Sequence, residues 1–193
     1  MKVLYVAAEA VPFAKTGGLA DVAGSLPKAL KEDGVDVRVI MPKFGKIPEK
    51  YRDNMEHVYD GEINVAWRSK FVGLDKYELD GVTYYFVDNE EYFNREGFYG
   101  YDDDAERFSF FCRAVLNLLP AMDFWPDVIN TNDWHAGLVN VFLKLDSLVV
   151  PILADSDVSE LVFRVDFRAL LVCGNRILSP SELQVDITLD IVQ

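Results

Sequence analysis

Residues 2–41 read KVLYVAAEAVPFAKTGGLADVAGSLPKALKEDGVDVRVIM and set the architecture of the chain. The apolar runs at residues 2–8 and 35–41 have the length and composition of strands that are buried on both faces of a sheet. Between these runs, apolar residues recur at helical spacing at Leu19, Val22, Ala23, Leu26 and Leu30. Gly34 follows them at the position of a helix C-cap. A strand, a helix and a strand in this order predict a βαβ unit and a parallel sheet.

Residues 62–88 predict an antiparallel excursion beside this unit, because alternating and aromatic residues surround the hairpin signal Asp80-Gly81. The run VTYYFV at residues 82–87 is expected to be the returning strand. Three further elements continue the pattern: a helix over residues 106–122, a strand over 127–131 and a helix over 134–145. The expected fold class is α/β, with a Rossmann-like, mostly parallel sheet flanked by helices and an antiparallel hairpin excursion.

Composition narrows the class of partner. Half of the 193 residues are hydrophobic, which suffices for one domain with a core, and the net charge of −13 argues against nucleic acid or an anionic membrane. Cys112 and Cys173 lie in apolar surroundings without a Cys-x-x-Cys motif, which argues against a disulfide framework or a zinc site. The chain shows neither a signal-peptide pattern nor a membrane-length apolar run, so we expect a cytoplasmic protein.

The first candidate site is KTGGLADV at residues 15–22, between the first strand and the first helix. Open α/β sheets bind ligands at this position, outside the carboxyl ends of strands. Gly17 and Gly18 would let the backbone approach a diphosphate closely and are free to take a positive φ. Lys15 would add a positive charge. The simpler interpretation is a glycine-rich turn that precedes a helix.

The second candidate site is NDWHAGL at residues 132–138, after a strand and at the start of a helix. Asp133, Trp134 and His135 could hold a sugar, with the carboxylate on hydroxyl groups, the indole on a ring face and the imidazole as a donor or acceptor. The alternatives are structural: Asp133 is a natural N-cap, Trp134 could belong to the core, and a lone histidine is more often structural than catalytic.

Two further segments have simpler explanations than ligand binding. The loop GFYGY at residues 97–101 could offer aromatic side chains to a ligand, but packing of the loop is the favoured explanation without other information. The acidic run at residues 102–104 could suggest a metal site. We expect it instead to be a solvated helix start, since carboxylates are favoured at helix N-termini. We therefore predict no metal and no cofactor.

Taken together, these segments resemble the bacterial glycogen/starch synthase family of ADP-glucose-dependent glucosyltransferases. The matching segments, in order, are AAEAVPF (7–13), KTGGLADV (15–22), MPKF (41–44), EYFNR (91–95), GFYG (97–100) and NDWHAGL (132–138). The resemblance implies the N-terminal half of a two-domain glycosyltransferase whose two Rossmann-like domains face a cleft. It also implies a metal-independent transfer of glucose from ADP-glucose to an α-1,4-glucan such as glycogen, with retention of configuration.

The resemblance also implies roles for single residues. Lys15, Gly17 and Gly18 would contact the ADP phosphates, and Asp21 would lie beside the donor nucleotide. Tyr99 would line the cleft near the nucleotide-sugar, and Glu9 would border the path of the acceptor. Asp133 would lie close to the reacting sugar, with Trp134 and His135 beside it; Asp133 and His135 are the candidate catalytic residues.

The resemblance ends near residue 145. Residues 146–193 lack the Ile-His-Asn element that the family pattern places there, and the chain carries no second Rossmann-like domain. We therefore expect residues 1–145 to form the N-terminal domain and residues 146–193 to be a divergent segment packed on it. We also expect the chain alone to be inactive and to self-associate through its exposed cleft face. Two alternatives remain: a non-catalytic module that binds carbohydrate or a partner, and another nucleotide-sugar transferase.

Overall fold

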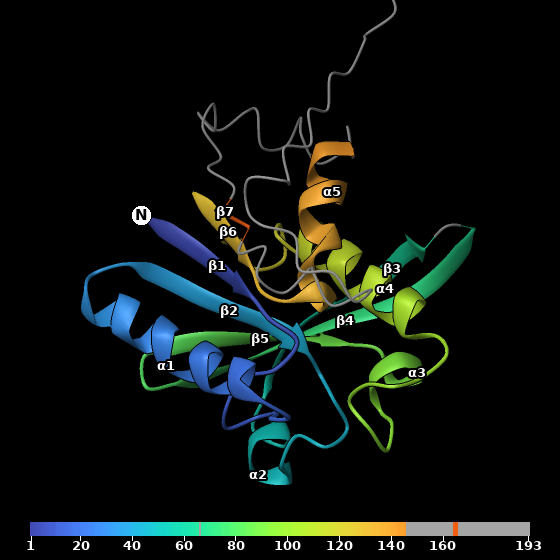
Figure 1. Ribbon diagram of the computed structural model, residues 1–193, viewed down its shortest axis with the longest axis horizontal. Helices are drawn as coiled ribbons and strands as arrows, with labels where there is room; N and C mark the ends of the chain where they lie inside the picture. The colour runs from blue at the N-terminus through green and yellow to red at the C-terminus, as the bar shows by residue number, and fades with distance from the viewer. Residues whose placement is uncertain (66, 146–163, 166–193) are drawn as a thin grey trace, which may run out of the picture.

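The computed structural model describes residues 1–65, 67–145 and 164–165, and these residues contain one seven-stranded sheet flanked by helices (Figure 1). The strands are β1 (Lys2–Val6), β2 (Asp36–Pro42), β3 (Glu56–Val65), β4 (Arg68–Leu79), β5 (Val82–Asp88), β6 (Val128–Thr131) and β7 (Arg164–Val165). The helices are α1 (Gly18–Glu32), α2 (Glu49–Arg52), α3 (Glu90–Phe93), α4 (Asp104–Asn117), the 3₁₀ turn η1 (Trp134–Ala136) and α5 (Leu138–Leu145). The expectations for residues 146–193 lie outside the described residues, apart from β7.

Strand β1 lies inside the sheet, in the order β3-β4-β5-β2-β1-β6-β7, as the apolar run at its position predicted. It pairs in parallel with β2 on one side and with β6 on the other, and β2 pairs in parallel with β5. Leu4, Val6, Val39 and Ile40 are fully buried in this part of the sheet. The predicted βαβ unit and parallel sheet are therefore confirmed.

The antiparallel excursion is also confirmed, although it begins at Glu56 and not at residue 62. β3 pairs with β4 and β4 with β5, both in antiparallel register. Asp80 and Gly81 have φ values of 52° and 76°, the left-handed conformation that a two-residue hairpin turn requires at both central positions. Because β5 also pairs in parallel with β2, the last strand of the excursion belongs to the parallel part of the sheet.

Helix α1 was predicted correctly, but its buried face was predicted only in part. Ala20, Ala23 and Pro27 are buried, whereas Val22 and Leu26 are 48% and 41% exposed. α1 packs closely: a Cβ on Gly24 would lie 2.3 Å from Val11 Cγ2 and 2.8 Å from the Val11 carbonyl oxygen. The face of α1 that packs against its neighbours therefore carries small residues, and the larger apolar side chains of Val22 and Leu26 are partly exposed to solvent.

The predicted helices at residues 106–122 and 134–145 differ from the observed ones. α4 begins earlier, at Asp104, and ends at Asn117, shortly before Pro120, since proline disfavours helical geometry in the residue that precedes it. The second segment is divided at Gly137 into η1 and α5. The turn η1 is preceded by Asp133, which has a positive φ of 63°.

The sheet order creates a switch point beside β1. From β1 the chain passes through α1 to β2, whereas β6 lies on the opposite side of β1. Ligands of open α/β sheets bind outside the carboxyl ends of strands at such a point. Both candidate motifs follow strands that flank it, one after β1 and the other after β6. The fold therefore brings together two segments that are more than a hundred residues apart in the sequence.

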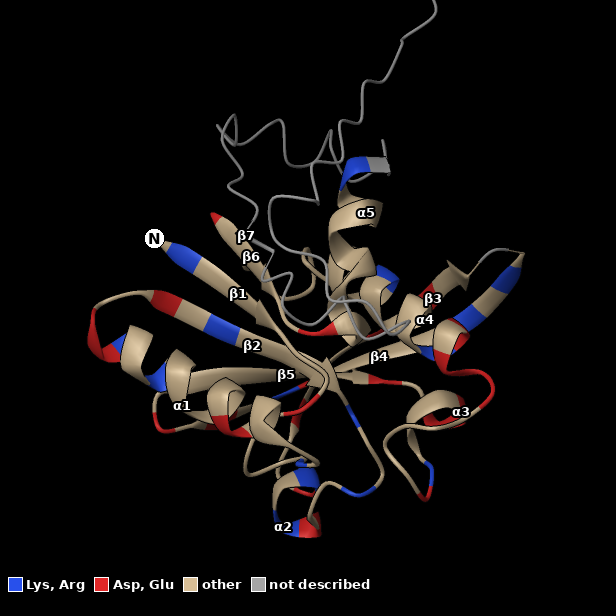
Figure 2. Cartoon of the chain, in the orientation of Figure 1, with Lys and Arg blue, Asp and Glu red and all other residues tan. Residues whose placement is uncertain are grey.

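Acidic and basic residues lie mostly on the helices and loops, and the central strands carry few of them (Figure 2). Helix α1 runs alongside β2 and β5, and α4 packs against α5 (Figure 1). Within the described part of the chain, no helix has both the length and the apolar composition needed to cross a membrane.

We expect Gly24→Ala to lower the free energy of unfolding by about 1–3 kcal/mol, because the new methyl group would collide with Val11 backbone as well as side-chain atoms. The control is Gly18→Ala on the same helix, where a Cβ meets nothing within 4 Å. Urea denaturation of the 193-residue chain measures both variants. Equal stability of the two variants would contradict the close packing of α1.

Candidate functional site

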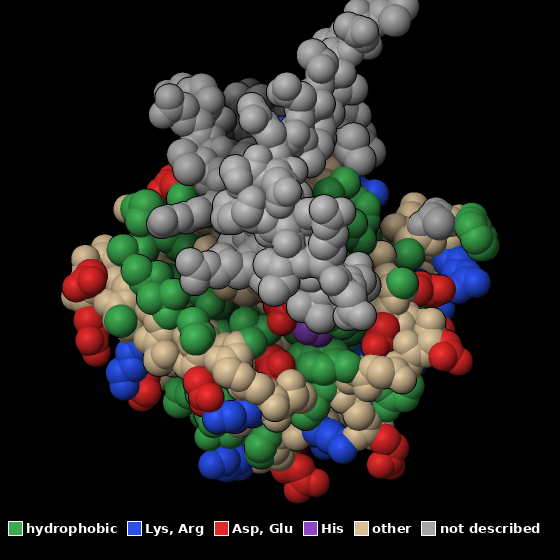
Figure 3. All heavy atoms as spheres, in the orientation of Figure 1, with side chains coloured by type: hydrophobic (Ala, Val, Ile, Leu, Met, Phe, Trp, Pro, Cys, Tyr) green, Lys and Arg blue, Asp and Glu red, His purple; other side chains and the backbone are tan. Residues whose placement is uncertain are grey.

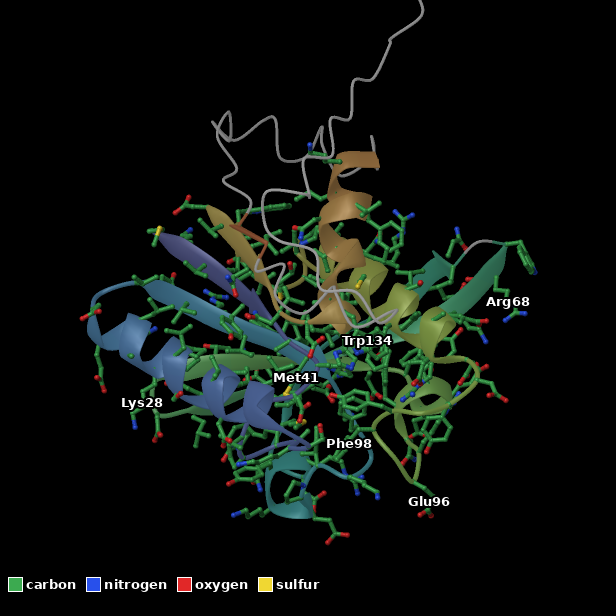
Figure 4. All side chains as sticks on the ribbon, in the orientation of Figure 1. Lys28, Met41, Arg68, Glu96, Phe98 and Trp134 are labelled. Atoms are coloured by element: carbon green, nitrogen blue, oxygen red, sulfur yellow. The ribbon has the colours of Figure 1, made fainter. Side chains whose placement is uncertain are left out.

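The candidate residues gather at the carboxyl edge of β1 and β6. Glu9 and the loop at residues 15–18 follow β1, and Asp133 to His135 follow β6. Figure 4 shows Met41, Phe98 and Trp134 near the centre of the view, where these strand ends meet, with Lys28, Arg68 and Glu96 at the periphery. In Figure 3, hydrophobic, acidic and histidine side chains lie side by side near the centre of this face.

Glu9 connects the elements of the site. Its side chain is only 4% exposed although it carries a carboxylate. It accepts hydrogen bonds from the backbone N–H of Thr16 and, at 2.7 Å, from the Thr16 hydroxyl group. It also accepts a hydrogen bond from the Tyr99 hydroxyl group at 3.2 Å. One buried carboxylate therefore fixes both the glycine loop after β1 and the aromatic loop at residues 97–101.

The glycine pair opens helix α1 with free space around it. Gly17 is the N-cap residue, and no side chain caps the first turn. A Cβ on Gly17 or Gly18 would meet nothing within 4 Å. Neither glycine uses the positive φ that is open to it: Gly17 has a φ of −152°, and Gly18 is not in the left-handed region. Only close approach of a ligand could therefore require glycine at these two positions.

Lys15 points toward the same turn. Its Nζ atom lies 2.6 Å and 2.8 Å from the two carboxylate oxygens of Asp21, one helical turn into α1. Both side chains are more than half exposed, so solvent screens the pair and it contributes little to stability. The ammonium group can exchange Asp21 for another anion at low cost.

Asp133 has the capping contact that the simpler interpretation predicted. Its carboxylate accepts a hydrogen bond from the backbone N–H of Trp134 at 2.6 Å. However, Asp133 has a φ of 63°, a conformation that costs a non-glycine residue about 1–3 kcal/mol and that clusters at functional sites. The strained backbone is compatible with both a structural and a functional role.

The aromatic rings of Tyr99, Trp134 and Phe108 enclose His135. Their centroids lie 4.4 Å, 3.9 Å and 4.7 Å from the imidazole centroid, in that order. His135 is 4% exposed, while Trp134 is 43% exposed and so is not a core residue. Neither imidazole nitrogen has a hydrogen-bond partner in the described part of the chain. Burial lowers the pKa of His135 to about 4, although Asp133 and Glu9 act to raise it, so the ring is neutral near pH 7.

The loop at residues 97–101 is packed, as its simpler interpretation predicted. Phe98 makes an edge-to-face contact with Phe44, and Tyr99 contacts Phe44 and Phe108 as well as His135. Burial, together with the carboxylate of Glu9, raises the pKa of Tyr99, so its hydroxyl group remains protonated and donates to Glu9. Tyr99 thus contacts His135 of one motif and is linked to the other through Glu9, which binds Thr16.

The acidic run contributes to the start of α4, as expected. Asp103 pairs with Arg95 through two hydrogen bonds of 2.7 Å and 2.6 Å, and Asp104 lies in the first turn. Across the described residues, no group of three or more histidine, cysteine or acidic side chains is arranged to hold a metal ion.

Sequence reasoning missed three residues of this site. Thr16 was quoted within the motif, but its two bonds to Glu9 were not foreseen. Phe108 lies within the helix predicted over residues 106–122 but was not singled out, yet its ring lies against both His135 and Trp134. Arg107 is completely buried and fixes the aromatic loop from α4. The position of an arginine in an amphipathic helix gives no sign of such burial.

Comparison with known proteins agrees with this geometry. The family model described as the starch synthase catalytic domain matches residues 2–152. The chain is 55% identical to a glycogen synthase of Anoxybacillus flavithermus over 144 residues, which cover 75% of this chain and 30% of that protein. It is 54% identical to a glycogen synthase of Clostridioides difficile over 148 residues, which cover 75% of this chain and 31% of that one.

A solved structure has the same architecture: the catalytic domain of starch synthase IV from Arabidopsis thaliana, bound to ADP and acarbose. The TM-score is 0.72 and the sequence identity 30%, over 84% of this chain and 32% of that one. The present chain thus spans about a third of each of these relatives or less. Since the family model covers most of its residues, and the fold is that of the solved relative, the chain belongs to the starch synthase catalytic domain family of glycosyltransferases.

Proposed function

We propose that this chain is the N-terminal part of an ADP-glucose-dependent glycogen synthase, which transfers glucose to the end of an α-1,4-glucan with retention of configuration. The observation that carries the proposal is the uncapped, open N-terminus of α1 beside Glu9, Asp133 and His135 at the switch point of the sheet. Such a terminus is suited to an anionic group, and the adjacent polar and aromatic side chains are suited to a sugar.

In this proposal, the donor phosphates lie over Gly17 and Gly18. The backbone N–H groups of the first turn of α1 point toward them, and Lys15 exchanges part of its contact with Asp21 for a phosphate oxygen. A chain with a net charge of −13 repels an anionic ligand at long range, so these local donors have to supply the attraction. The ADP in the solved starch synthase IV structure supports this choice of ligand.

The sugar is assigned to the space between the two motifs. Asp133 accepts hydrogen bonds from sugar hydroxyl groups and lies near the reacting carbon, and the half-exposed Trp134 offers a ring face. The neutral imidazole of His135 still has a donor and an acceptor to offer, because its nitrogens are unpaired within the described residues. Glu9 and Tyr99 border the acceptor path and keep the two motifs in register.

We further propose that residues 1–145 form the N-terminal domain of a cytoplasmic enzyme, with residues 146–193 packed on it. Transfer needs donor, acceptor and charge stabilisation to be held together, and good positioning contributes roughly 7–11 kcal/mol. We therefore expect the 193-residue chain to incorporate no glucose into glycogen by itself and to self-associate through its cleft face.

We expect Gly18→Val to weaken ADP binding to the chain about tenfold or more, because the isopropyl group would occupy the space assigned to a phosphate. The matched control is Ser25→Val, which places the same side chain on an exposed position of α1, away from its N-terminus. Isothermal titration with ADP compares the two. Equal affinities in the two folded variants would exclude the glycine pair as the phosphate site.

The lowered pKa of His135 makes stability depend on pH. In the unfolded chain the imidazole of His135 takes up a proton near pH 6.5, but in the folded chain it does so only near pH 4. The free energy of unfolding therefore falls as the pH drops from 6.5 to 4. We expect His135→Gln to lose less free energy of unfolding than the parent between about pH 7 and about pH 5 in urea denaturation. An identical loss in both proteins would show that His135 is not held neutral.

A chimeric protein can distinguish the proposed glucosyltransferase function from that of a non-catalytic binding module. We expect residues 1–145, joined to the remainder of the A. flavithermus glycogen synthase, to transfer glucose from ADP-glucose to glycogen. In this chimera Asp133→Asn should lower kcat/KM by about a hundredfold or more. Asp127→Asn, at the opposite end of the same strand, should leave it unchanged. A folded chimera that binds ADP without transferring glucose would favour the binding module.

A further inference from the structure

Arg107 is the largest fully buried side chain near the site, and the proposed function gives it no role. It has no exposed surface, and its Nη1 atom lies 2.5 Å from the Asp104 carboxylate. Its Nε atom donates to the Tyr92 carbonyl at 2.7 Å, and its guanidinium lies 5.0 Å and 5.3 Å from the ring centroids of Tyr101 and Phe108. A charge is buried in this way only when it is fully paired.

The contacts of Arg107 and Asp104 converge on the backbone around Tyr99. Arg107 Nη2 donates to the Phe98 carbonyl at 3.4 Å, immediately before Tyr99. Asp104 accepts from the Gly100 N–H at 2.7 Å, immediately after it. One ion pair on α4 thus holds the residues on both sides of Tyr99, whose side chain extends from this point to Glu9 and His135.

We propose that the Arg107–Asp104 ion pair is a positioning device that holds Tyr99 over His135 and against Glu9, and thereby sets the shape of the sugar site. Neither residue of the pair contacts substrate in this proposal; they act through the backbone of residues 98–100. The effect of the ion pair on catalysis rests on the proposed function, but the position of Tyr99 can be tested without measuring catalysis.

Asp104→Asn tests the pair with little change of shape. The carboxylate offers two oxygens, one to Arg107 and one to Gly100, whereas an amide offers only one acceptor. One side of the Tyr99 loop therefore loses its partner, and the remaining bonds lose their charge assistance. With Tyr99 free to move away, water reaches the imidazole of His135.

The pKa of His135 distinguishes this effect from a direct effect of charge. Asp104 acts to raise the pKa of His135, so removing its charge alone would lower that pKa. Release of Tyr99 would instead remove part of the burial that keeps the pKa near 4, and would raise it toward 6.5. The two explanations therefore predict shifts of opposite sign.

The experiment is an NMR titration of the histidine ring protons in the 193-residue chain, with His57→Gln to assign the two histidines. We expect Asp104→Asn to raise the pKa of His135 by about one unit or more. Arg107→Met should raise this pKa as well, but the guanidinium charge itself acts to lower it, so only Asp104→Asn separates the two explanations. The control is Asp103→Asn, which removes the neighbouring carboxylate and its pair with Arg95 but no bond to residues 98–100. We expect it to leave the pKa of His135 unchanged.

An unchanged or lowered pKa of His135 in folded Asp104→Asn would overturn the proposal. Asp104→Asn decides the matter whether or not Arg107→Met folds, because its expected shift is opposite to that of a lost charge. In the chimera, Asp104→Asn should lower kcat/KM while Asp103→Asn does not. If the chimera without substitutions is inactive, that result counts against the proposed function. The NMR titration of His135 would still test whether the ion pair positions Tyr99.

Discussion

The parallel pairing of β1 on both of its sides is the constraint on which the rest of the structure depends. Because β2 and β6 run in the same direction as β1, the loops that leave β1 and β6 meet at one edge of the sheet. β2 and β6 lie on opposite sides of β1, so the strand order reverses at this point. The two loops therefore border the kind of switch-point crevice in which open α/β sheets bind ligands. The glycine loop and the Asp-Trp-His segment become neighbours for this reason.

Electrostatics then determine what this edge can hold. Glu9 is buried, and its carboxylate is occupied by hydrogen bonds from Thr16 and Tyr99. The carboxylate of Asp21 is paired with Lys15. Two acidic groups beside the glycine loop are therefore engaged by the protein, which leaves the positive end of α1 available to an anion despite the negative charge of the whole chain. The neutral His135 adds no charge to this balance.

The parts of the fold that local sequence determines were predicted. Apolar runs gave β1 and β2, helical spacing gave α1, and Asp80-Gly81 gave the hairpin turn. The exposure of Val22 and Leu26 was not predicted, because the contact of Gly24 with Val11 determines which side of α1 packs against the rest of the domain. The break at Gly137 was missed because the apolar pattern continues through it. In both places tertiary packing prevails over local periodicity.

The candidate site follows the same division. The motifs at residues 15–22 and 132–138 could be found in the sequence because strand ends and turns mark them. The bond between Tyr99 and Glu9 could not, since it joins positions that are 90 residues apart. The burial of Arg107 was also hidden, because an arginine in a helix normally faces solvent. Recognition of the family supplied the residue types, and the fold supplied the contacts among them.

The central claim is that the edge between β1 and β6 is where this protein holds its nucleotide ligand. The most direct measurement is an amide chemical-shift map of the 193-residue chain during titration with ADP. The largest shifts should fall on the first turn of α1, at Gly17, Gly18 and Leu19, with smaller ones at Asp133 to His135. Saturable shifts confined to other parts of the sheet, with these amides unmoved, would contradict the claim.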